Sequence, residues 1–128
     1  MKNIQLIASD IDGTLLLNDS QAIDSEIFNL IHQLEQKNIL FMAASGREYT
    51  NLRDLFSPVA DDIAYLCLNG CLTFYKGKCI SKEVMDTNLA RKLIKIIQNE
   101  PNAEVLVSGE KTCYITLKNQ SYYEHLTN

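Results

Sequence analysis

Asp10-Ile11-Asp12-Gly13-Thr14 places two carboxylates two residues apart, directly after an apolar run. The preceding segment, Ile4 to Ala8, predicts a buried strand, and Gly13 with Thr14 predicts the turn that leaves it. In an open α/β sheet, ligands bind outside the carboxyl ends of the strands. Two carboxylates and the backbone between them, at that edge, suit a hard cation and a phosphate group.

The first half of the chain alternates apolar strands with amphipathic helices. A first helix is expected between Asp24, its N-cap, and Asn38, which can take the left-handed conformation that ends a helix. Ile39 to Ala44 predicts a second strand, with Ser45-Gly46-Arg47 as its exit turn and another helix after it. Ala64 to Leu68 predicts a third strand. This alternation predicts an α/β fold with a parallel sheet.

The pattern changes after Asn69-Gly70. Residues 72–81 predict a hairpin around Lys76-Gly77, and a helix with Thr87 or Asn88 near its N-cap should follow. Residues 104–108 and 112–117 predict two more strands. This α-β-β unit predicts the opening of a separate α+β module, so we place a domain boundary near residue 82.

Composition narrows the class of protein. With 128 residues, a net charge of −4 and a pI near 5.1, the chain gives no electrostatic support for nucleic acid or an anionic membrane as partner. Neither a signal peptide nor a membrane-spanning run is recognisable. The cysteines at 67, 71, 79 and 113 form no C-x-x-C pair and mostly lie in strand-like segments. They predict buried, reduced thiols and a cytoplasmic protein.

With Asp10-Ile11-Asp12-Gly13-Thr14 ending the first strand and Ser45-Gly46-Arg47 ending the second, the chain resembles the haloacid dehalogenase superfamily of phosphohydrolases. The Asn69-Gly70 turn and the late α-β-β unit resemble its Cof-type branch, whose cap is inserted after the third strand. The resemblance covers about the first half of a full-length member. It implies an incomplete Rossmann-like core in residues 1–81 and the beginning of an α+β cap domain in residues 82–128.

The resemblance implies catalytic roles for the two aspartates. Asp10 would be the nucleophile that forms an aspartyl-phosphate, and Asp12 the general acid and then the general base. Because Asp10 and the substrate phosphate are both negative, the protonated form of Asp12 should be favoured. Mg²⁺ would bind the Asp10 carboxylate and the Asp12 backbone carbonyl.

Four further residues are candidates for binding substrate. Ser45 and the helix N-terminus at Gly46 would hold the phosphoryl group, and Arg47 the phosphate or the organic part of the substrate. Asn69 would lie at the pocket edge. Each also has a structural interpretation: Ser45-Gly46 as a helix-capping turn, Arg47 as a surface or structural arginine, and Asn69-Gly70 as a turn.

Full-length relatives carry two later motifs, a lysine and a Gly-Asp with a further acidic residue, and nothing after Leu117 resembles them. The strands that flank the first strand in the superfamily are also missing. The first strand should therefore be a sheet edge, and we expect a homodimer through that edge, or a need for another partner.

The expected function is a Mg²⁺-dependent phosphohydrolase of small phosphorylated metabolites, with weak or no activity in the isolated chain. A sugar phosphomutase of the same superfamily is an alternative, as is a catalytically silent fragment that acts as an interaction module. A receiver-type phosphoacceptor domain is a more distant one, because its acidic pocket is assembled from separate strands.

Overall fold

A computed structural model describes residues 4–17, 20–110, 112–116, 118, 120, 122 and 124. The chain divides into two compact units, Met1–Glu83 and Val84–Asn128, which we call unit 1 and unit 2. The first contains all of the sequence-predicted site residues. That the second belongs to a cap domain stays a prediction.

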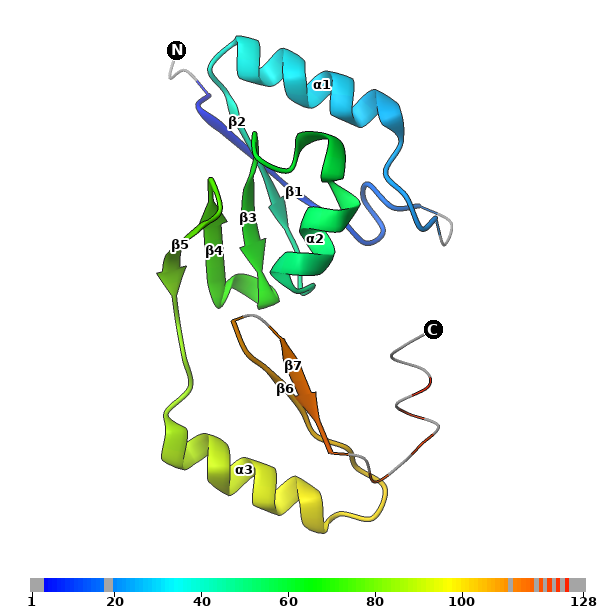
Figure 1. The fold of residues 1–128 in the computed structure, drawn as a ribbon, viewed down its shortest axis with the longest axis vertical. Helices are drawn as coiled ribbons and strands as arrows, with labels where there is room; N and C mark the ends of the chain where they lie inside the picture. Colours follow the sequence, from blue (N-terminus) through cyan, green and yellow to red (C-terminus); the bar gives the residue numbers. More distant parts are fainter. Residues whose placement is uncertain are drawn as a thin grey trace. The chain divides into compact units, whose positions relative to one another are not determined.

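Unit 1 is built on a five-stranded sheet in which spatial order follows chain order (Figure 1). Its strands are β1 (Leu6–Asp10), β2 (Leu40–Ala44), β3 (Ala64–Cys67), β4 (Leu72–Tyr75) and β5 (Lys78–Lys82). The first three strands are parallel, and the last two continue the sheet as an antiparallel hairpin. The predicted α/β class and the hairpin are confirmed. β1 starts two residues later than its apolar run indicated, and it ends at Asp10.

Two helices connect the parallel strands: α1 (Ser25–Gln36) and α2 (Tyr49–Leu55). Asp24 caps α1 as predicted, since its Oδ1 accepts the Glu26 N–H at 2.9 Å. Asn38 follows the helix with a φ of 57°, the left-handed conformation expected of it. Short 3₁₀ turns, η1 (Ser57–Val59) and η2 (Leu68–Gly70), flank β3.

The connections from β1 to β2 and from β2 to β3 run in the same direction across the sheet. Because such crossovers are right-handed, both helices cover the same face of the sheet. Ile31 of α1 and Leu52 of α2 share one buried cluster with Phe41 and Ala43 of β2. Leu52 and Ala43 are fully buried. The neighbouring residues of β2, Leu40 and Met42, point to the opposite face because side chains alternate along a strand, and they are only half-buried.

Unit 2 contains α3 (Thr87–Asn99) and an antiparallel pair, β6 (Leu106–Ser108) and β7 (Cys113–Ile115). Asp86 caps α3, next to the predicted Thr87, and its Oδ1 accepts the N–H groups of Asn88 and Leu89 at 3.0 and 2.9 Å. The predicted strand end, Leu117, lies outside the described residues. No helix in the described part of the chain has the length and apolarity needed to cross a membrane.

The prediction that the cysteines are buried holds for Cys67 alone. Cys71 and Cys79 are exposed and Cys113 is half-buried, although all four are free thiols. Cys79 is exposed because every residue of β5, at the outer edge of the sheet, faces solvent. Burial raises the pKa of Cys67 to about 11.

Thiol alkylation at about pH 8.5, the ordinary pKa of a cysteine, should therefore separate these residues. We expect Cys71 and Cys79 to react rapidly and Cys67 to react at least about tenfold more slowly, because Cys67 is buried and largely protonated at that pH. Peptide mapping by mass spectrometry after timed quenching gives the rates. Equal rates at positions 67 and 71 in the folded protein would contradict the described packing of β3.

Candidate active site

The carboxyl ends of β1 and β2 bring Asp10 beside the Ser45 turn. In the parallel register, Asp10 lies opposite Ala44, the last residue of β2. Ser45 follows directly, and its N–H donates to the Leu66 carbonyl of β3 at 2.9 Å. Asp10 is exposed, whereas Ser45 is 7% exposed. The two candidates therefore lie at the same edge of the sheet, where ligands of α/β folds bind.

The turn after β1 is organised around Ile11, which is fully buried. Its carbonyl accepts the N–H groups of Thr14, Leu15 and Leu16 at 3.2, 2.9 and 2.9 Å. Gly13 allows the turn, because its φ is 83°. Burial of Ile11 leaves the aspartates on either side of it turned outward. Thr14 Oγ1 donates to Asp10 Oδ2 at 3.2 Å, a contact that the sequence pattern does not indicate.

Arg47 donates hydrogen bonds from two of its nitrogens to the carboxylate of Asp12. Nε lies 3.0 Å from Oδ2 and Nη2 lies 2.7 Å from Oδ1, the paired geometry that makes such ion pairs strong. The remaining nitrogen, Nη1, donates to Asn51 Oδ1 at 3.0 Å. Asn51 lies four residues further on in α2, a helical spacing that could have suggested the contact. This geometry favours the structural interpretation of Arg47.

The Arg47 contact stabilises the ionised form of Asp12. Its hydrogen bonds hold the pKa of Asp12 below the ordinary value, against the opposing effect of partial burial. The charge of Arg47 and a hydrogen bond from Ser45 act in the same direction as those bonds. Without a substrate, the pKa of Asp12 therefore lies below its ordinary value. That a negative substrate phosphate favours the protonated form of Asp12 stays a prediction.

The turn after β3 holds the Ser45-Gly46-Arg47 segment from the other side. The Leu68 N–H donates to the Arg47 carbonyl at 3.1 Å, and the Asn69 N–H donates to the Ser45 carbonyl at 3.2 Å. Leu68 and Asn69 reach these positions with φ values of 51° and 55°. For leucine, this left-handed conformation costs roughly 1–2 kcal/mol, which the surrounding structure must offset.

The Asn69 side chain packs against Gly46. A Cβ atom at position 46 would lie 3.1 Å from Asn69 Oδ1, so a larger residue there would crowd the asparagine. In addition, Ser45 Oγ accepts the Arg47 N–H at 3.2 Å, in a local serine turn. α2 begins at Tyr49 with Glu48 as its N-cap, so Ser45 does not cap this helix, and the prediction of a helix N-terminus at Gly46 is wrong. The structure thus brings Asp12, Ser45, Gly46, Arg47 and Asn69 together, and places Asp10 next to them on β1.

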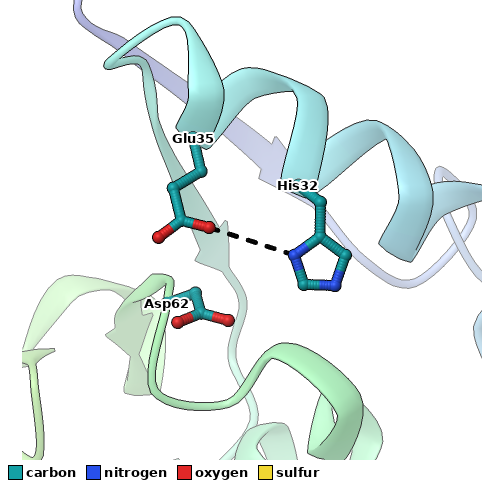
Figure 2. A group of neighbouring side chains, drawn as sticks. All are labelled: His32, Glu35 and Asp62. Carbon is teal, nitrogen blue, oxygen red and sulfur yellow. Dashed lines mark ion pairs between the residues drawn. The ribbon is translucent and has the colours of Figure 1, made fainter.

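A separate group of ionisable residues, drawn in Figure 2, lies at the amino ends of the strands, opposite to the Asp10 site. His32 and Glu35 come from the last turns of α1, which precedes β2, and Asp62 precedes β3. Their ligand atoms lie within 4.8 Å of one another, and all three residues are exposed. His32 Nδ1 lies 3.9 Å from Glu35 Oε2. This surface group is not part of the Asp10 site.

Substitution of Asn69 tests whether its main role is conformational. Alanine tolerates the left-handed backbone conformation of position 69 less well than asparagine does. We therefore expect Asn69→Ala to reduce the free energy of unfolding by about 1 kcal/mol. Asn69→Gly keeps the backbone conformation accessible and should lose less. Urea unfolding of both variants measures the difference. Alanine tolerated better than glycine would contradict the described turn.

Comparison with known proteins places the chain in a family. The family model for haloacid dehalogenase-like hydrolases matches residues 7–128. The 5-amino-6-(5-phospho-D-ribitylamino)uracil phosphatase YbjI of Escherichia coli is 30% identical over 117 residues, which are 91% of this chain and 42% of that protein. A phosphoglycolate phosphatase of Sulfolobus acidocaldarius is 33% identical over 97 residues, 75% of this chain and 41% of that protein.

Solved structures agree with the sequence relatives. A crystal structure from Eubacterium rectale superimposes with a TM-score of 0.87 at 26% identity, over 98% of this chain and 48% of that chain. SMU.1108c from Streptococcus mutans gives a TM-score of 0.83 at 26% identity, with the same coverage. The chain thus spans less than half the length of these relatives. Together with the family match, these similarities show that the chain belongs to the haloacid dehalogenase-like hydrolases.

Proposed function

We propose that this chain carries the nucleophile-bearing part of a Mg²⁺-dependent phosphohydrolase that acts on small phosphorylated metabolites through an aspartyl-phosphate. One observation carries the proposal: exposed Asp10, the last residue of β1, lies opposite Ala44, the residue before Ser45, at the carboxyl ends of the parallel strands. The names of the E. coli and S. acidocaldarius relatives, both phosphatases of small organic phosphates, support the substrate class.

Asp10 is the proposed nucleophile. Thr14 donates to Oδ2 of its carboxylate, which fixes the orientation of the group and leaves Oδ1 for attack on phosphorus. The bond from Oδ1 to phosphorus forms as the bond from phosphorus to the ester oxygen breaks. Ser45, with its hydroxyl at the same edge, donates a hydrogen bond to an oxygen of the transferring phosphoryl group.

Asp12 is the proposed proton carrier, and Arg47 lowers its pKa. While Arg47 holds the carboxylate, the lowered pKa keeps Asp12 ionised, which is the form that accepts a proton from water. To protonate the leaving alkoxide, Asp12 must first hold a proton. An arriving phosphate competes for the guanidinium, and its own negative charge raises the pKa of Asp12 further.

The residues present fit a magnesium ion. Among the described residues, the backbone hydrogen bonds of the turn use the carbonyls of Ile11 and Leu16, and none uses the carbonyl of Asp12. This carbonyl and the exposed Asp10 carboxylate would hold the ion, and both are the hard oxygen donors that Mg²⁺ prefers. When bound, Mg²⁺ supplies positive charge against the phosphoryl oxygens.

A second candidate function is an interaction module without turnover. Trapping of the first chemical step separates the two candidates, since phosphorylation of Asp10 needs fewer groups than full turnover.

We expect incubation with Mg²⁺ and acetyl phosphate or an aryl phosphate to add one phosphoryl group to the peptide that contains Asp10. Mass spectrometry of acid-quenched digests detects the added mass, and the modification should disappear in Asp10→Asn. Asp54→Asn is the matched control, because Asp54 is an exposed aspartate of α2 in the same unit and should leave the modification unchanged.

Two results would contradict the proposal. Phosphorylation that persists in Asp10→Asn would place the nucleophile elsewhere. Complete absence of the modification with both phosphate donors would favour the module without turnover.

A further inference from the structure

Three side chains with metal-ligating atoms meet at the amino ends of the strands of unit 1 (Figure 2). One ring nitrogen of His32 and one carboxylate oxygen each of Glu35 and Asp62 lie within 4.8 Å of one another. His32 and Glu35 share one side of α1 because they are three residues apart, and Asp62 comes from the turn before β3. We define the His32 cluster as these three residues.

Buried neighbours hold the backbone of the His32 cluster in place. Ile31, directly before His32, is buried, and Ile63, directly after Asp62, is fully buried. Both belong to the core that also contains Val59, and the Asp62 N–H donates to the Val59 carbonyl at 3.0 Å. Packing of the core therefore brings the cluster together, although its side chains are exposed.

Other protein groups leave the ligating atoms of the cluster available. His32 Nδ1 lies 3.9 Å from Glu35 Oε2, which is beyond hydrogen-bond distance. In the described part of the chain, no side-chain hydrogen bond or ion pair engages Asp62. The neighbouring Asp61, by contrast, accepts from Arg53 Nη1 at 3.0 Å. Arg53 thus offsets the charge of Asp61, and the charge of Asp62 remains for another cation.

The distances within the cluster fit a tetrahedral metal ion. Around zinc, with bonds of about 2.1 Å to nitrogen and oxygen, ligand atoms lie about 3.4 Å apart. The 3.9 Å between His32 Nδ1 and Glu35 Oε2 is close to this value. The 4.8 Å limit for the whole cluster exceeds it by about 1.4 Å, which small rotations of exposed side chains can close. Three protein ligands leave the fourth position for water or a small ligand.

The donor set favours a transition metal over magnesium. Two carboxylates balance the charge of a divalent cation, and imidazole is a ligand that suits zinc, copper, iron and nickel. Mg²⁺ prefers oxygen ligands alone, as at the Asp10 site. Glu35 and Asp62 also line a cavity of about 360 Å³. A metal held by these side chains therefore has room beside it for water or a small ligand.

We propose that His32, Glu35 and Asp62 form a binding site for a divalent transition metal of the zinc type. The bound ion would link the end of α1 to the turn before β3. The proposal does not depend on the proposed function, because the site contains none of the residues to which a role in phosphoryl transfer is assigned.

Titration of the ¹⁵N-labelled chain with Zn²⁺ in excess Mg²⁺ tests the proposal. Mg²⁺ saturates oxygen-only sites such as the one proposed at Asp10, so that zinc reports on the site that contains imidazole. The accessible cysteines are alkylated first, because thiolates also bind zinc. One equivalent of Zn²⁺ should shift the amide signals of the His32 cluster and the imidazole nitrogen signals of His32. Calorimetry of the same sample gives the affinity.

Variants of single ligands separate the site from general zinc binding. Loss of a residue that only supports a metal ligand typically lowers affinity at least about tenfold, so loss of a ligand itself should cost at least as much. We therefore expect His32→Gln and Asp62→Asn each to weaken zinc binding at least about tenfold. Glu26→Gln is the matched control, because Glu26 is an exposed glutamate in the first turn of α1, and it should leave the affinity unchanged.

Three results would overturn the proposal. One is equal zinc affinity in His32→Gln and the unchanged chain. Another is a set of zinc-dependent shifts that leaves out the His32 cluster, a result that needs no variant to fold. The third is equal weakening by Glu26→Gln, which would show attraction of zinc to the acidic surface in general.

Discussion

The parallel register between β1 and β2 is the constraint on which the candidate site depends. It aligns Asp10 with Ala44, so that the residues following β2 begin where β1 ends. A shift by one residue would turn Asp10 to the other face of the sheet. Ile11, fully buried behind the site, opposes such a shift, because the shift would move an apolar side chain out of the core. Packing of one isoleucine therefore helps to fix the position of two carboxylates.

Contacts between loops then hold the site in one arrangement. Arg47 ties the turn after β1 to α2 through Asp12 and Asn51. The strained turn at Leu68 and Asn69 ties β3 to the carbonyls on both sides of Gly46. Strain of this kind persists where the surrounding structure enforces it, and it is commonly found at functional sites. Fixed donors and acceptors lower the reorganisation that a phosphoryl transfer would otherwise need.

Much of the fold could be predicted from local signals that reflect local physics. Apolar runs gave the parallel strands, Asp24 and Asn38 the limits of α1, and Lys76-Gly77 the hairpin. Predictions from sequence were wrong, or could not be made, for properties that tertiary contacts determine. The exposure of Cys79 depends on β5 being an outer strand. The ion pair between Asp12 and Arg47, thirty-five positions away, likewise depends on the fold. The roles of Thr14 and Asn51 were missed because each depends on which partner the fold brings within reach.

The most direct test of the central claim is an NMR titration of the ¹⁵N-labelled chain with beryllium fluoride and Mg²⁺, which together mimic a phosphorylated aspartate. If Asp10 and Ser45 form one phosphoryl site, the largest amide shifts should fall on Asp10, Ser45 and Gly46, and Asp10→Asn should abolish them. Shifts centred on His32, Glu35 and Asp62, or shifts that persist in Asp10→Asn, would contradict this account.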